Sequence, residues 1–158
     1  MGTHPPSPPR RRSDTASTAP ATSPGQTRRW PPALTTAAGA FYLFTAGIHV
    51  GIVAADAQFY RPMADQSVWG FVRTGWTEIF MAHPHAWGLF AVALEALLGL
   101  LLLAGGRPAR VGWMGIIAFQ VALVLFGWGF LLWSLPFGVL LILAARHDWP
   151  LLTRGEER

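Results

Sequence analysis

The sequence predicts an all-α membrane protein, a bundle of four transmembrane helices with an extracytoplasmic amphipathic helix between the first and the second. Three observations predict this fold class. Hydrophobic residues make up 52% of the 158 residues and charged residues only 13%, whereas soluble domains carry roughly 25% charged residues. The apolar residues form long segments, and the arginines flank these segments. Cysteine is absent, which excludes disulfides, thiolate metal sites and dithiol redox chemistry.

The N-terminal part of the chain divides into a tail and a first span. Residues 1–30 are rich in Pro, Ser, Thr and Arg. Such a segment buries too little apolar surface to offset the entropy of ordering, so we expect a disordered cytoplasmic tail. The first span is expected over residues 33–55. This segment is longer than the apolar core of a signal peptide and long enough for a bilayer core of about 30 Å.

Three further spans complete the expected transmembrane domain, residues 31–148. The second is expected over residues 87–105. The apolar tract that follows is too long for one crossing, and the glycines on either side of Trp128 favour a hairpin within it. We therefore expect spans over residues 111–127 and 129–145, and then a short cytoplasmic tail, residues 149–158. We interpret the aromatic residues near the hairpin as an interfacial belt; they are Trp128, Phe130, Trp133 and Phe137.

The arginines predict the orientation of the bundle. Only Arg61 and Arg73 fall on the side of the loop between the first two spans. The arginines near the spans on the other side are Arg28, Arg29, Arg107, Arg110, Arg146, Arg154 and Arg158. By the positive-inside rule, both termini are cytoplasmic, as in a multi-pass protein of a bacterial inner membrane. Because the arginines serve this role, we expect the lipid bilayer as a partner and no nucleic acid.

The loop between the first and second spans contains the expected amphipathic helix, over residues 68–80. Its polar residues take most of one helical face. Its apolar residues share the other face, which suits a helix on the membrane surface or over the mouth of the bundle. These apolar residues are Val68, Trp69, Val72, Trp76, Ile79 and Phe80.

A few polar residues within the spans are the candidates for a site. In the first span, Tyr42, Thr45 and His49 recur at helical spacing, and Asp56 continues the same face. Small residues surround Glu95 in the second span, which lets another helix approach its carboxyl group. Gln120 lies near the middle of the third span.

We predict a cluster of His49, Glu95 and Gln120 inside the bundle. Ionisable groups within a membrane are functional candidates because burying them is costly. A carboxyl group beside an imidazole suits proton transfer or hydrogen bonding to a quinone-like headgroup. The alternative is structural: a neutral Glu95 ties the helices together through His49 or Gln120. Tyr42 and Thr45 are more typical of packing or of hydrogen bonding to the helix backbone.

Two weaker patterns complete the candidates. His83 and His85 flank Pro84 before the second span, but two histidines without a third ligand make a weak metal site, and a turn is the simpler interpretation. Gly47 and Gly51 form a small-xxx-small pair, which is typical of close helix contacts within a bundle or in a homodimer. We found no motif for a resident cofactor.

The sequence resembles the DoxX-like family of small four-helix bacterial membrane proteins over residues 34–146. The resemblance rests on Gly47-Ile48-His49, and on Glu95-Ala96-Leu97-Leu98-Gly99 with the leucines that follow it up to Ala104-Gly105-Gly106-Arg107. It implies the four-helix fold. It also implies a link to quinone-dependent sulfur oxidation, although most members have no assigned activity. This chain has His49 where many relatives have Lys, and it lacks the Cys pairs of others.

These observations favour a non-enzymatic or accessory membrane protein whose polar core binds a lipid-soluble small molecule. The alternative is a membrane subunit of a quinone-linked oxidoreductase, which would need a membrane or redox protein partner. A small transporter component is less favoured, because one polar cluster supplies no continuous hydrophilic path.

Overall fold

A computed structural model describes residues 1–2 and 31–153, so the predicted N-terminal tail and most of the C-terminal tail lie outside the described residues. The chain is an all-α bundle, as the sequence predicts. Four of its helices are long and apolar enough to cross a membrane. They are α1 (Ala33–Asp56), α3 (Pro84–Ala104), α4 (Gly106–Leu123) and α5 (Trp128–Thr153).

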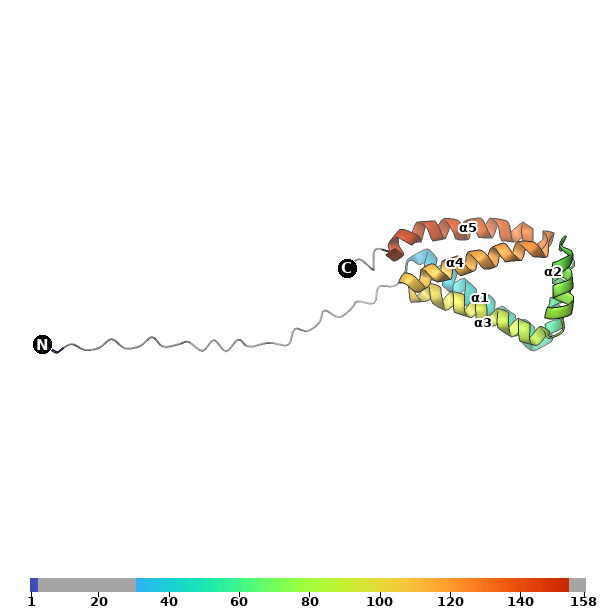
Figure 1. The fold of residues 1–158 in the computed structure, drawn as a ribbon, viewed down its shortest axis with the longest axis horizontal. Helices are drawn as coiled ribbons and strands as arrows, with labels where there is room; N and C mark the ends of the chain where they lie inside the picture. Colours follow the sequence, from blue (N-terminus) through green and yellow to red (C-terminus); the bar gives the residue numbers. More distant parts are fainter. Residues whose placement is uncertain (3–30, 154–158) are drawn as a thin grey trace.

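The four long helices form a wedge rather than a parallel bundle (Figure 1). α1 runs beside α3, and α4 runs beside α5. The two pairs meet at the end where α1 begins and α5 ends, and they diverge toward the opposite end. There the short helix α2 (Gly70–Gly75) crosses the mouth of the wedge. We call these the terminal end and the loop end.

Glycines allow α1 and α3 to pack closely. A Cβ atom on Gly39 would lie 3.0 Å from the backbone oxygen of Gly99, and one on Gly99 would lie 2.9 Å from that of Gly39. Nearer the loop end, a Cβ on Gly88 would meet the Val53 side chain at 2.5 Å. This confirms the expectation that small residues around Glu95 let a neighbouring helix approach.

Two short turns connect the remaining long helices. Gly105, with φ of 73°, separates α3 from α4. After α4, the short 3-10 helix η3 (Val124–Phe126) leads to Gly127, whose φ of 100° starts α5. The glycine hairpin is thus confirmed. As a helix, α5 continues past residue 145, the predicted end of the fourth span, to Thr153.

The connection between α1 and α3 is largely helical. It contains the 3-10 helix η1 (Ala57–Ala64), then α2, then the π-helical turn η2 (Trp76–Phe80). The predicted amphipathic helix is present as α2 and η2. Of its apolar residues, Trp76 and Phe80 are half-buried, whereas Ile79 is exposed.

Hydrogen bonds hold this connection against the hairpin between α4 and α5. Ser67 Oγ donates to the Leu125 backbone oxygen at 2.6 Å. Gln66 Oε1 accepts from the Gly129 backbone N–H at 2.7 Å. This N–H lies in the first turn of α5, where helix donors have no partner within the helix. Gln66 therefore caps a helix from a distant part of the chain.

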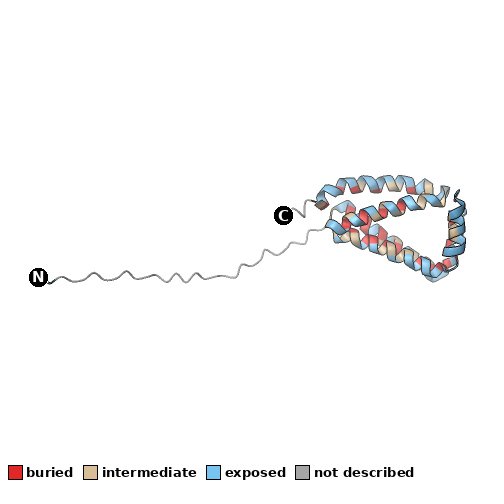
Figure 2. Cartoon of the chain, viewed as in Figure 1, coloured by how far each residue is buried: buried red, intermediate tan, exposed pale blue. Residues whose placement is uncertain are grey.

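Buried residues form two apolar clusters, at opposite ends of the wedge (Figure 2). The larger cluster includes Leu98, Leu102 and Trp113, and it joins the four long helices toward the terminal end. The smaller cluster, Val53, Tyr60 and Met81, joins α1 to the loop-end connection. A cavity lies between the diverging helices, in contact with both clusters.

Candidate functional site

The cavity has a volume of about 440 Å³ and an almost entirely apolar wall. All four long helices contribute to it, and the connection between α1 and α3 covers it at the loop end. All the polar residues that the sequence predicts for the site line it: Tyr42, Thr45, His49, Glu95 and Gln120. Cavities of this size are typical of sites for small molecules.

The structure brings His49 and Glu95 together, as predicted. The His49 Nε2 atom lies 4.0 Å from Glu95 Oε1. Glu95 is only 4% exposed, and its other oxygen, Oε2, has no hydrogen-bond partner within residues 1–2 and 31–153. On the other side of the imidazole, His49 Nδ1 lies 3.3 Å from the Tyr60 hydroxyl group. Tyr60, His49 and Glu95 thus form a row of polar groups along the cavity.

Of the other predicted residues, Thr45 lies beside the Glu95 carboxyl group, and Tyr42 and Gln120 lie elsewhere on the cavity wall. The Thr45 hydroxyl group donates to the Tyr42 backbone oxygen at 3.0 Å, which is the back-bonding that the sequence favoured. Tyr42 is buried, and its ring makes an edge contact with Phe119, with centroids 6.3 Å apart. Gln120 is held on the opposite wall, where its amide points to the Ser134 backbone oxygen at 3.5 Å.

Aromatic rings supply most of the cavity wall. Trp76 and Phe80 stack with centroids 3.8 Å apart, and Trp76 makes an edge contact with Phe126 at 5.0 Å. The contact with Phe126 joins the loop-end cover to η3, between α4 and α5. Part of the predicted interfacial belt also faces inward, because Phe130, Trp133 and Phe137 line the cavity whereas Trp128 is 65% exposed. The other aromatic residues of the wall are Phe41, Tyr42, Tyr60, Trp87, Phe90 and Phe119.

Several sequence candidates lie outside the site. Asp56 does not continue the polar face of α1 into the cavity; its carboxylate instead accepts from the Gln58 backbone N–H at 2.8 Å. His83 and His85 are exposed near the start of α3, and no group of three His, Cys, Asp or Glu residues gathers anywhere in the described part of the chain. Gly47 is exposed, with nothing near its Cα that a side chain would meet.

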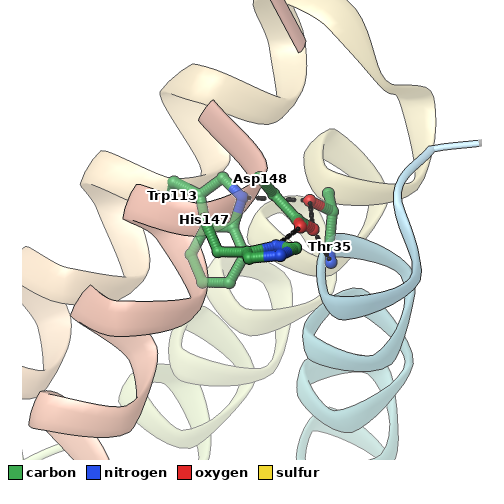
Figure 3. Close-up of polar contacts among 4 residues, drawn as sticks. All are labelled: Thr35, Trp113, His147 and Asp148. Carbon is green, nitrogen blue, oxygen red and sulfur yellow. Dashed lines mark hydrogen bonds and ion pairs between the residues drawn. The ribbon is translucent and has the colours of Figure 1, made fainter. Parts of the chain in front are cut away.

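A second buried acid, Asp148, lies at the terminal end (Figure 3). Its Oδ2 accepts hydrogen bonds from both the backbone N–H and the hydroxyl group of Thr35, each at 2.8 Å. The indole N–H of Trp113 donates to the same hydroxyl oxygen at 3.2 Å. His147 Nδ1 lies 2.8 Å from Asp148 Oδ1. This cluster joins α1, α4 and α5, and its carboxylate caps the first turn of α1.

The sequence analysis did not identify Tyr60 or the Asp148 cluster. A signal for Asp148 was present, since Leu141, Ala145, Asp148 and Leu152 recur at helical spacing, and all four are buried. Following this spacing past residue 145 predicts a longer helix with an acid on its inner face. Tyr60 carries no comparable signal, because its contact with His49 depends on how the chain turns after α1.

Comparisons with protein-family models, curated proteins and solved structures find no match for this chain. The class of the protein therefore follows from its own helices and cavity. Four long apolar helices define a multi-pass α-helical membrane protein, and between them lies an aromatic cavity with one incompletely paired acid.

Proposed function

We propose that this protein binds a small lipophilic molecule in the cavity between its diverging helices. The observation that carries the proposal is the composition of the wall, which is almost wholly aromatic and aliphatic but contains the row Tyr60, His49 and Glu95. An apolar wall with a few convergent polar groups is the usual form of a small-molecule site. Binding of this kind suits an accessory protein rather than an enzyme.

The position of the cavity supports a ligand that comes from the bilayer. Its wall is built from helices that are long and apolar enough to span a membrane. A lipophilic body would gain contact with rings such as Trp133 and Phe119. The headgroup would lie beside His49 and Glu95, which belong to α1 and α3 on one side of the wedge.

Mass spectrometry of molecules extracted from the purified protein tests this proposal. Wild type should retain a small lipophilic molecule that is depleted in both His49→Ala and Glu95→Gln. The matched control is His83→Ala, which removes an imidazole outside the cavity and should leave the retained molecule in place. If all four proteins carry the same ordinary phospholipids and nothing else, the cavity is not a ligand site.

A quinone-linked oxidoreductase subunit is a second candidate function. The observation that favours it is the row itself, because a hydroxyl group, an imidazole and a carboxyl group in succession suit proton transfer at a quinone headgroup. The resemblance of the stretches around His49 and Glu95 to the DoxX-like family points the same way. A quinone in the wild-type extract, lost from both cavity variants, would select this candidate.

We also propose that the protein lies in a bacterial inner membrane with both termini cytoplasmic. The charges support this orientation: Arg107 and Arg110 lie in α4 near the terminal end, whereas Arg61 and Arg73 lie in the connection at the loop end. A reporter enzyme active only in the cytoplasm, fused after Arg158, should be active. The same reporter inserted at the exposed Gln58 should be inactive, and the reverse pattern would contradict the proposal.

A further inference from the structure

The Glu95 carboxyl group lies at the cavity without the full set of partners that a buried carboxyl group requires. Its Oε2 atom accepts no hydrogen bond from the described residues, 1–2 and 31–153. The imidazole of His49 pairs with the other oxygen only at 4.0 Å, which is longer than a hydrogen bond. Leaving a buried acceptor unpaired is unfavourable, so a molecule in the cavity that donates a hydrogen bond to the Glu95 carboxyl group would be stabilised there.

The wall of the cavity favours positive charge. The faces of aromatic rings carry negative electrostatic potential, and indole rings attract cations most strongly. Trp76, Trp87 and Trp133 all line the cavity. No arginine is among the lining residues, so a negatively charged headgroup would meet the Glu95 carboxyl group without a strong cation to offset it. Both the rings and the carboxyl group therefore disfavour anions.

We propose that the ligand of this cavity is a lipophilic amine, whose ammonium group donates an N–H hydrogen bond to the Glu95 carboxyl group and whose apolar body lies among the aromatic rings. A charge-assisted hydrogen bond of this kind is stronger than one from a neutral hydroxyl group. The proposal rests on the proposed function, because it names the chemical class of molecule that the same cavity binds.

The test uses ligands that share one apolar body. Naphthylethylamine carries charge and N–H donors, its trimethylammonium analogue carries charge without a donor, and naphthylethanol carries a neutral donor. Binding to the purified full chain in lipid nanodiscs is measured by equilibrium dialysis, with empty nanodiscs as the blank for partition into lipid. The amine should bind wild type about tenfold more tightly than the alcohol, and more tightly than the trimethylammonium analogue.

Two acid-to-amide variants separate the carboxyl group of the cavity from acidic residues in general. Glu95→Gln should weaken amine binding about tenfold and leave alcohol binding nearly unchanged. Glu78→Gln, which removes an exposed carboxyl group outside the cavity, should bind all three ligands as wild type does. An amine that binds wild type and Glu95→Gln equally, or no more tightly than the alcohol, would overturn the proposal. The ligand comparison on wild type decides the question even where Glu95→Gln folds poorly.

A third variant distinguishes failure of this inference from failure of the proposed function. Ala91 lines the cavity, so Ala91→Phe places a ring inside it. If Ala91→Phe weakens alcohol and amine binding alike while Glu95→Gln changes neither, the cavity binds lipophiles but is not selective for amines. If Ala91→Phe changes no binding at all, the proposed function fails together with the inference.

Discussion

The wedge buries one carboxyl group at its terminal end and one at its loop-end cavity, and the two differ in the hydrogen bonds that they accept. At the terminal end, Asp148 is 1% exposed and accepts hydrogen bonds from the Thr35 backbone and hydroxyl group. At the loop-end cavity, Glu95 is 4% exposed, and its Oε2 atom has no partner in the described part of the chain. Asp148 and Glu95 are therefore similarly buried, but Asp148 is fully hydrogen-bonded and Glu95 is not.

This difference separates a structural acid from a functional one. The Asp148 carboxylate lies at the N-terminus of α1, where it accepts two hydrogen bonds from Thr35. Its surroundings are complete, and they hold three helices together. Glu95 on α3 faces the His49 imidazole at 4.0 Å and the Thr45 side chain, both on α1, but its Oε2 atom accepts no hydrogen bond within the described residues. A buried acid that the fold does not satisfy is a candidate for binding a ligand.

The largest expected effect is the loss of the Asp148 carboxylate. Asp148→Ala removes the acceptor from two Thr35 donors and leaves them buried, which should lower the free energy of unfolding by about 3 kcal/mol. Unfolding in mixed micelles with increasing SDS, followed by far-UV circular dichroism, measures this change. His147→Ala is the matched control, because the His147 side chain is 69% exposed and should contribute under about 1 kcal/mol. Equal effects from the two substitutions would contradict the assignment of Asp148 as the structural acid.

The next effect concerns the close packing of α1 on α3. Gly39→Ala places a Cβ about 3.0 Å from the Gly99 backbone oxygen, and the shift that relieves it should cost roughly 1–3 kcal/mol. Gly47→Ala is the matched control on the same helix, where nothing lies within 4 Å of the new Cβ. Since alanine has a higher helix propensity than glycine, Gly47→Ala should raise the free energy of unfolding by up to about 1 kcal/mol. In the same SDS titration, the free energy of unfolding should fall in Gly39→Ala and rise in Gly47→Ala. A lower free energy of unfolding in Gly47→Ala would indicate an unrecognised helix contact at this position.

The sequence predicts the helices better than it predicts the site. Long apolar segments and the hairpin at Gly127 follow from local composition and backbone freedom, so the four-helix fold was predictable. The depth of His49 and Glu95 in their spans suggested a shared cluster, but the sequence does not encode helix order, so their contact could not be predicted. The divergence of the helix pairs was not, since it depends on how the whole connection docks at Gln66. The cavity exists because the helix pairs diverge, so the sequence did not predict which aromatic residues line it.

A smaller effect is expected from the hydrogen bond that docks the connection at the loop end. Gln66→Ala leaves the Gly129 N–H in the first turn of α5 without its cap, which should cost about 1 kcal/mol. Gln58→Ala is the control, because its side chain accepts only from Arg61 on the exposed surface. Limited tryptic proteolysis after Arg73 should accelerate in Gln66→Ala but not in Gln58→Ala. Identical cleavage rates in the two variants would show that this bond does not hold the connection over the cavity.

The smallest expected effect on stability is that of Glu95→Gln, and it gives the sharpest test of the comparison. The substitution keeps the shape of the side chain and breaks no hydrogen bond at Oε2, so the free energy of unfolding should change by less than about 0.5 kcal/mol. Asp148→Asn is its counterpart at the terminal end. It exchanges a charge-assisted acceptor at the α1 N-terminus for a neutral one, and should lower the free energy of unfolding by about 1 kcal/mol or more.

If Glu95→Gln lowers the free energy of unfolding as much as Asp148→Asn does, Glu95 ties the helices together through His49. The two acids would then serve the same structural role. If Glu95→Gln is as stable as wild type but no longer retains the lipophilic molecule, Glu95 binds the ligand rather than stabilising the fold.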